Sequence, residues 1–301
     1  YEYFANTFGT GNNVSYINAG MSGTSSVVGN LRAENDMLNS NPDIIFIEFS
    51  VNDHPEEIYK KAFESLVVKC LSQENEPAVI LIINRSKGGY SMQEQMAAIG
   101  KNYDLPIISM DNALTSALNA GTITWADYAA DDYHPHEKGS QIPADCIAYY
   151  YRQAMKTENE TAPYSMPDTV VYGNEYSTAS IAPVSELQNL NNGSFVFKSP
   201  SGRFPYGWTF TKNSSNTPLT FTTSGKGIFV LFKSNQNSSL GVLNVTVNGV
   251  SKQIAGNRNY AWGGPDADIA YIQNETGELN VSISMESAST DFEIYGIGVI
   301  K

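Results

Sequence analysis

Two short runs of almost entirely apolar residues constrain the fold of this chain most. Residues 43–49 and 78–84 are rich in Ile, Val, Leu and Phe. Runs of this length and composition are typical of parallel strands that are covered on both faces. Segments with helical spacing of apolar residues follow them, over residues 58–73, 92–103, 112–120 and 140–155. This alternation predicts a doubly wound, flavodoxin-like α/β domain with a largely parallel sheet.

The first forty residues fit the same domain. Residues 1–8 have the pattern of a helix that ends before two glycines, residues 13–18 alternate like a strand, and residues 28–39 have a helical pattern. A loop of small residues, 19–26, joins the predicted strand to the predicted helix. A further short strand is predicted over residues 105–110.

The pattern changes after about residue 156. Residues 157–183 are rich in Thr, Ser, Pro, Asn and Tyr and predict an ordered connector. Residues 184–301 contain about nine short strand patterns, separated by turn signals at 192–193, 224–225 and 248–249. The strand patterns are 194–198, 207–211, 219–223, 227–232, 241–247, 251–254, 268–273, 277–285 and 291–299. We therefore expect an α/β domain over residues 1–156, a connector, and an antiparallel sandwich, most simply a jelly roll.

The charge of the chain excludes one class of partner. The 301 residues carry a net charge of −13, and the isoelectric point is about 4.6. A surface this acidic does not attract a phosphate backbone, so nucleic-acid binding is not expected. It also disfavours a polyanionic substrate and allows a neutral one.

The cysteines and histidines give no sign of a metal site. Cys70 and Cys146 lie in apolar helical patterns, which predicts buried thiols without a disulfide framework. Two of the three histidines lie in one loop, so neither a metal nor a cofactor is expected. No apolar run approaches the length of a membrane span. A soluble protein is expected, and the sequence leaves its compartment and oligomeric state open.

Three polar loops carry the chemistry of the predicted α/β domain. Asp131 precedes His134 by three residues on a turn that contains Pro135, and this spacing can place the carboxylate against imidazole Nδ1. A polar loop that caps the next helix is the simpler alternative. Asn52 follows the strand of residues 43–49, and Gly23 lies in the small-residue loop before a helix. The carboxyl ends of parallel strands meet at one rim, where free amide donors favour an oxyanion hole.

These three loops, in this order, resemble the sequence blocks of the SGNH (GDSL-type) hydrolases. The resemblance lies in residues 18–23, 50–53 and 131–135 and covers the chain to about residue 155. It implies that His134 is the general base and that Asp131 orients it. It also implies that Gly23 N–H and the Asn52 amide stabilise the oxyanion. Asp53 directly follows Asn52, and we expect it to contact substrate or to hold the Asn52 loop.

Two departures from the family pattern bear on the mechanism. Ser50 stands where the third block usually has glycine, which is acceptable if its side chain faces away from substrate. The Gly-Asp-Ser or Gly-Gly-Ser block with the nucleophile is expected upstream of Tyr1 and is not found in this sequence. Ser22, Ser25 and Ser50 are nearby alternatives, but none has the expected strand–turn context. An incomplete or inactive relative remains the other interpretation.

The predicted second domain resembles the carbohydrate-binding modules of polysaccharide deacetylases. Trp262 and Tyr260 lie in a loop rich in Gly and Pro, and we expect this loop to reach the esterase site and bind sugar. Trp262→Ala is then expected to raise KM on acetylated oligosaccharides and to spare small aryl acetates. Trp208 begins a strand pattern and is interpreted as a core residue.

The sequence therefore predicts a serine esterase that removes O-acetyl groups from a plant-type oligo- or polysaccharide without a cofactor. One alternative is an esterase that acts on a lipid ester or a thioester. Another is a carbohydrate-binding protein that has lost its nucleophile.

Overall fold

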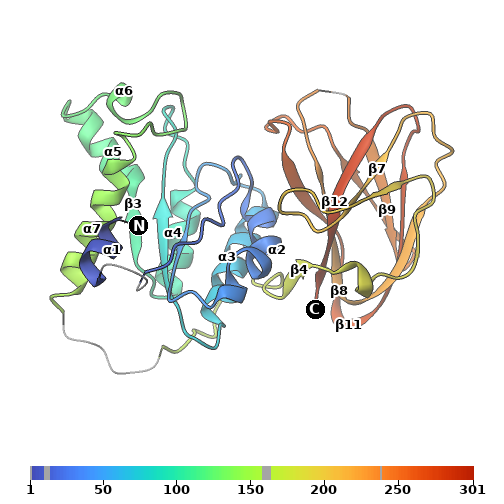
Figure 1. The fold of residues 1–301 in the computed structure, drawn as a ribbon, viewed down its shortest axis with the longest axis horizontal. Helices are drawn as coiled ribbons and strands as arrows, with labels where there is room; N and C mark the ends of the chain where they lie inside the picture. Colours follow the sequence, from blue (N-terminus) through green and yellow to red (C-terminus); the bar gives the residue numbers. More distant parts are fainter. Residues whose placement is uncertain (1, 10–13, 158–163, 238) are drawn as a thin grey trace.

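A computed structural model describes residues 2–9, 14–157, 164–237 and 239–301, and it contains two domains (Figure 1). The first domain contains the helices and a small parallel sheet, and the second contains most of the strands. The α-helices are α1 (Glu2–Phe8), α2 (Ser26–Asp36), α3 (Glu57–Leu71), α4 (Gln93–Asn102), α5 (Met110–Asn119), α6 (Trp125–Tyr128) and α7 (Gln141–Ala154). Short 3-10 turns occur at Leu38–Ser40 and Val184–Glu186.

The sheet of the first domain has helices on both faces. Its strands, β1 (Ile44–Ile47), β2 (Ala78–Ile83) and β3 (Ile107–Ser109), are parallel and lie in sequential order. Val79, Leu81 and Ile83 of β2 pack into the core formed with α3 and α4. Ile80 packs into a separate core formed with α5 and α7. Continuous apolar composition in β2 thus reflects burial on both faces, as predicted.

One predicted strand is absent from this sheet. Residues 14–18 have no paired strand, and residue 13 lies outside the described residues. Alternation alone does not make a strand, because a strand needs a neighbour that satisfies its backbone hydrogen bonds. Among the described residues, no strand pairs with the outer edge of β1.

The second domain is one antiparallel sheet of nine strands that curves around its own core (Figure 1). The central order is β10-β9-β11-β8-β12-β7-β6. The strands are β4 (Ala179–Ile181), β5 (Gln188–Asn191), β6 (Val196–Lys198), β7 (Gly207–Phe210), β8 (Leu219–Lys233), β9 (Val242–Val247), β10 (Val250–Ala255), β11 (Pro265–Met285) and β12 (Phe292–Ile300). The antiparallel all-β prediction is confirmed, and Trp208 is fully buried as predicted.

The described residues contain nine strands in this sheet, and about nine were predicted, but some of the predicted strand boundaries are wrong. Residues 219–223 and 227–232 belong to the single strand β8, so the turn predicted at 224–225 does not exist. Residues 268–273 and 277–285 likewise form the single strand β11, which pairs with β8 through two register shifts. Glycine interrupts the hydrophobic pattern in both strands, and a bulge accommodates it without reversing the chain.

The hydrophobic core of the second domain extends into the first domain. Val27, Val28 and Leu31 of α2 and Ala62 of α3 pack with the core residues of the β-sandwich. β4 lies within the predicted connector, yet it pairs with β12. The middle of the same connector is held on the first domain, where the Glu64 carboxylate accepts hydrogen bonds from the N–H groups of residues 171–173. These parts of the connector are therefore packed against the two domains.

Two sequence expectations concern the burial of the cysteines, and a third concerns membrane-spanning helices. Cys70 is buried as predicted, whereas Cys146 is only half-buried because α7 covers one edge of the domain. Across the described ranges, no helix has both the length and the apolar composition that crossing a bilayer requires.

Candidate active site

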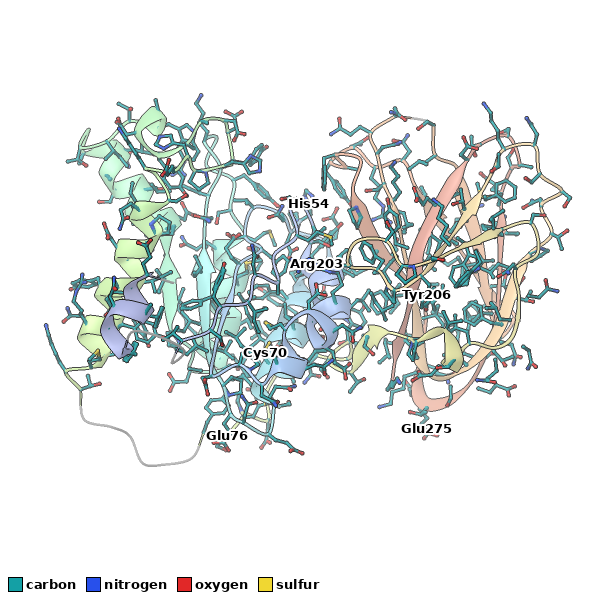
Figure 2. All side chains as sticks on the ribbon, in the orientation of Figure 1. His54, Cys70, Glu76, Arg203, Tyr206 and Glu275 are labelled. Atoms are coloured by element: carbon teal, nitrogen blue, oxygen red, sulfur yellow. The ribbon has the colours of Figure 1, made fainter. Side chains whose placement is uncertain are left out.

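A cleft of about 1300 Å³ lies where the two domains meet. Its first wall comes from residues 18–25, from β1 and the loop after it, and from the loop around His134. Its second wall comes from the β-sandwich, through residues 234–236 and 259–266. Figure 2 labels His54 and Arg203 at this boundary between the domains. We call this space the interdomain cleft.

Asp131 and His134 form a hydrogen-bonded pair at its rim. Imidazole Nδ1 lies 2.8 Å from Asp131 Oδ2, and Asp131 Oδ1 accepts the N–H groups of Tyr133 and His134. These two backbone donors and the imidazole lower the pKa of Asp131 to about 2. The carboxylate is therefore ionised throughout the working range of an esterase, and the pair leaves Nε2 free to accept a proton.

Trp125 supports the same turn, although no sequence signal predicted this role. Its indole N–H donates to the backbone carbonyl of Asp131 at 2.7 Å. The His134 side chain remains 75% exposed, so its free nitrogen is accessible from the interdomain cleft. His136 is different, because it bonds to Gly139 N–H and lies near the Ala126 carbonyl, which makes it part of the turn before α7.

Gly23 lies in an exposed turn directly before α2. Its φ angle is +65°, in the left-handed region that favours glycine. A Cβ atom at this position would collide with the indole of Trp262. Within the described part of the chain, the Gly23 N–H donates to no acceptor, so it is available to a ligand in the cleft.

Asn52 lies beside the same space, at the carboxyl end of β1. Its backbone N–H donates to the Phe49 carbonyl at 3.0 Å, which closes the loop, and its side chain lines the cleft. Gly23 and Asn52 come from different loops, and both line the cleft together with His134. Their roles as oxyanion hole and general base stay predictions.

Asp53 does not occupy the position predicted for a substrate contact. It is only 1% exposed, and its Oδ1 accepts the N–H of Ser26 at 2.7 Å. Burial raises its pKa to about 8. Asp53 faces inward because its carboxyl group caps the first turn of α2, so it connects the Asn52 loop to the loop that contains Gly23.

The serines near the site differ in their freedom to react. Ser50 is fully buried, donates to Glu48 and the Asn84 carbonyl, and accepts the Asn84 N–H. Its side chain thus faces away from the cleft, as its replacement of glycine requires. Ser25 is 8% exposed, and its hydroxyl is buried without a partner. Ser22 is exposed at the cleft wall. In the described structure, none of these hydroxyls is hydrogen-bonded to His134.

Trp262 and Tyr260 of the second domain reach the first domain, as expected. The Trp262 indole N–H donates to the Gly23 carbonyl at 2.8 Å. The Tyr260 hydroxyl lies 2.6 Å from the Tyr59 hydroxyl, and its ring lies 4.0 Å from the His54 ring, centroid to centroid. Burial lowers the pKa of His54, which favours the neutral imidazole in this contact. Tyr59 was not predicted, because a tyrosine on a helix gives no sequence signal of a cross-domain partner.

The interdomain cleft combines a polar wall with aromatic rings. Trp262 is 59% exposed and Tyr260 is 40% exposed, while Tyr133 and Tyr90 line the opposite side. Aromatic faces and nearby polar groups are what a neutral sugar needs, since its C–H face stacks and its hydroxyls form hydrogen bonds. The described residues contain no group of three or more His, Cys, Asp or Glu side chains suited to a metal ion.

Comparison with solved structures identifies similar proteins over almost the whole chain. One is a two-domain esterase active on acetylated mannans, with a TM-score of 0.80, 27% identity, and coverage of 95% of this chain and 80% of the other. The second is a structure of a two-domain esterase of the same description co-crystallised with mannopentaose. It matches with a TM-score of 0.81 and 28% identity and covers 99% of this chain and 83% of the other. No protein-family model and no curated protein matches the sequence. The structural matches confirm the predicted resemblance to a carbohydrate acetylesterase with a second, carbohydrate-binding-like domain.

Proposed function

We propose that this two-domain ester hydrolase removes O-acetyl groups from mannan-type oligo- or polysaccharides. The observation that carries the proposal is the interdomain cleft, where His134, Asn52 and Gly23 face Tyr260 and Trp262 of the second domain. The first group has the chemistry for ester hydrolysis, and the second has the surfaces for a sugar. The similarity to esterases active on acetylated mannans supports this substrate class.

The mechanism follows from the roles that these groups can fill. A serine hydroxyl attacks the acetyl carbonyl, and His134 Nε2 takes the hydroxyl proton while Asp131 holds the imidazolium. The negative charge on the carbonyl oxygen is stabilised by Gly23 N–H and the Asn52 amide, and each donor contributes roughly 3–4 kcal/mol. His134 then protonates the sugar oxygen as the ester C–O bond breaks, and the sugar leaves as an alcohol. Water hydrolyses the acetyl-serine by the reverse proton transfers and releases acetate.

The nucleophile in this proposal is a serine that the described residues do not identify. The Ser50 hydroxyl is hydrogen-bonded to Glu48 and Asn84, and the Ser25 hydroxyl is buried. The interdomain cleft extends along β1, where it is lined by Ile45, Phe46 and Ile47. We also propose an SGNH-type fold for the first domain and a jelly roll for the second.

Acetate release tests the function directly. The native protein is incubated with acetylated mannooligosaccharides and with acetylated xylooligosaccharides, and His134→Ala serves as the inactive control. We expect acetate from the mannan substrate and a loss of roughly 10²–10⁴-fold in the variant. Release that does not depend on His134, or release from the xylan substrate alone, would contradict the proposal.

The unassigned nucleophile supports a second candidate, a carbohydrate-binding protein without esterase activity. A serine-directed phosphonofluoridate distinguishes the two. The esterase proposal expects one labelled serine, which peptide mapping locates and mannooligosaccharide protects. Labelling of Ser22 or Ser25 would move the nucleophile into the described structure. Mannooligosaccharide binding without labelling or acetate release would favour the binding protein.

A further inference from the structure

The loop that contains Gly23 has few supports of its own. Residues 14–23 contain no helix or strand, and most of them are exposed. The turn at its end is closed by the Thr24 N–H and hydroxyl, which both donate to the Met21 carbonyl at 3.4 and 2.8 Å. A segment of this kind is held in one conformation only if other parts of the molecule bind it.

Besides Thr24, three side chains among the described residues donate to backbone carbonyls of this loop, and two of them come from the second domain. Arg32 of α2 donates to the Ala19 carbonyl at 3.1 Å. Arg203 donates to the Asn18 carbonyl at 2.7 Å, and its other nitrogen lies 3.1 Å from the Asp36 carboxylate. Trp262 donates to the Gly23 carbonyl at 2.8 Å. The β-sandwich therefore holds both ends of the segment from residue 18 to residue 23.

The contact at Gly23 is the one closest to the chemistry. Gly23 lines the cleft and its N–H has no acceptor among the described residues, while its carbonyl accepts the Trp262 indole N–H. The two groups are joined through the φ and ψ angles of one residue, and glycine is the residue with the greatest freedom in those angles. A hydrogen bond that fixes the carbonyl therefore also limits the directions in which the N–H can point.

We propose that Trp262 is a positioning residue for ester hydrolysis, which holds the Gly23 N–H in the oxyanion hole through the Gly23 carbonyl. This inference rests on the proposed function and deepens it, because the second domain then contributes to catalysis on any ester and not only to sugar binding. It also revises the expectation that Trp262→Ala spares small aryl acetates. The hydrogen bond and the stacking face belong to the same side chain, so their effects need separate variants.

Trp262→Phe separates them, because it keeps an aromatic face and removes the N–H donor. The side chain is 59% exposed, so the variant is expected to fold. We expect kcat to fall about 10-fold on 4-nitrophenyl acetate and on an acetylated mannooligosaccharide. This is a fraction of the roughly 10²–10³-fold lost when an oxyanion donor is removed outright. KM for the oligosaccharide should change less than 3-fold, whereas Trp262→Ala should lower kcat on both substrates and also raise that KM.

Tyr271→Phe is the matched control. It also removes one donor and keeps the ring, since the Tyr271 hydroxyl bonds to Gln273 on β11, outside the cleft. Its kcat on both substrates should equal that of the unmodified protein. Arg203→Gln removes the other contact from the β-sandwich and should lower kcat on 4-nitrophenyl acetate, whereas Lys198→Gln, which breaks an exposed ion pair with Glu293, should not.

Hydrogen exchange gives a readout that does not depend on activity. In Trp262→Phe, the Thr24 amide should exchange about 10-fold faster, while amides in β8 and β11 should be unchanged. A Trp262→Phe variant with normal kcat and normal exchange would overturn the inference, and so would a change confined to KM for the oligosaccharide. If the unmodified protein released no acetate from either substrate, the proposed function would fail, and faster exchange at Thr24 would still support the positioning contact.

Discussion

Nδ1 of His134 lies 2.8 Å from Oδ2 of Asp131, and the other oxygen of the same carboxylate accepts two backbone N–H groups of the turn. One side chain thus fixes both the conformation of the turn and the orientation of the imidazole. The neighbouring Asp132 is exposed and faces Lys87 at 3.7 Å, so it has no part in this arrangement.

Asp131→Asn should lower kcat by roughly 10²–10⁴-fold, because the amide cannot stabilise the imidazolium and can hold the wrong tautomer. Asp132→Asn is the control and should retain nearly full activity. Initial rates on 4-nitrophenyl acetate check both variants. Equal losses of kcat in the two variants would contradict the assignment of Asp131 as the partner of His134.

Asn52→Ala should lower kcat by about 10²–10³-fold with little change in KM, since the amide is needed mainly when charge develops on the carbonyl oxygen. Asn52→Asp should be worse, because a carboxylate repels that charge. Asn75→Ala removes an amide bound to the Pro42 carbonyl on the far side of the domain and serves as the control. A rise in KM without a fall in kcat would assign Asn52 to substrate binding instead.

His54→Ala should weaken oligosaccharide binding. Tyr260 packs on the His54 ring at 4.0 Å, and the loss of this contact leaves the sugar-facing ring less ordered. We expect KM for acetylated mannooligosaccharides to rise about 3- to 10-fold, with kcat on 4-nitrophenyl acetate unchanged. Titration calorimetry with mannopentaose checks the binding step, and unaltered affinity would speak against this role.

The stability of the protein should depend on pH through Asp53. Burial raises its pKa to about 8 in the folded state, whereas an exposed aspartate titrates near 3.9. The folded state therefore binds this proton more tightly, and the stability from this group is full below about pH 4 and is lost as pH rises towards 8. Asp53→Asn keeps an acceptor for the Ser26 N–H and removes the titration. Urea unfolding at pH 5, 7 and 9 should show a smaller loss of stability in the variant; parallel curves would contradict the assignment.

Ser50→Gly should reduce stability by about 1–3 kcal/mol and leave kcat nearly unchanged. The hydroxyl is buried and connects Glu48 to the backbone of Asn84, so glycine leaves these polar groups unpaired. Thermal unfolding and aryl acetate hydrolysis check the two halves of this prediction. A large loss of activity at unchanged stability would place Ser50 in the chemistry instead.

The sequence by itself determined the features that depend on short stretches of chain. The continuous apolar runs become β1 and β2, and β2 is covered on both faces of the sheet, whereas Phe46 of β1 is exposed. The Asp131–His134 pair could be predicted because only three residues separate its members and the turn supplies the geometry. Asn52 could be placed at the rim because it follows a buried strand.

Only the tertiary structure decided which distant groups meet. Trp262 and Gly23 are 239 positions apart, and no local pattern encodes a contact that depends on how two domains pack. The inward position of Asp53 and the continuity of β8 and β11 were also missed. The sequence does not show whether the Asp53 carboxyl group, which follows Asn52, faces solvent or a helix terminus. A glycine in a strand looks the same whether the chain turns or bulges, because the choice is made by the neighbouring strand.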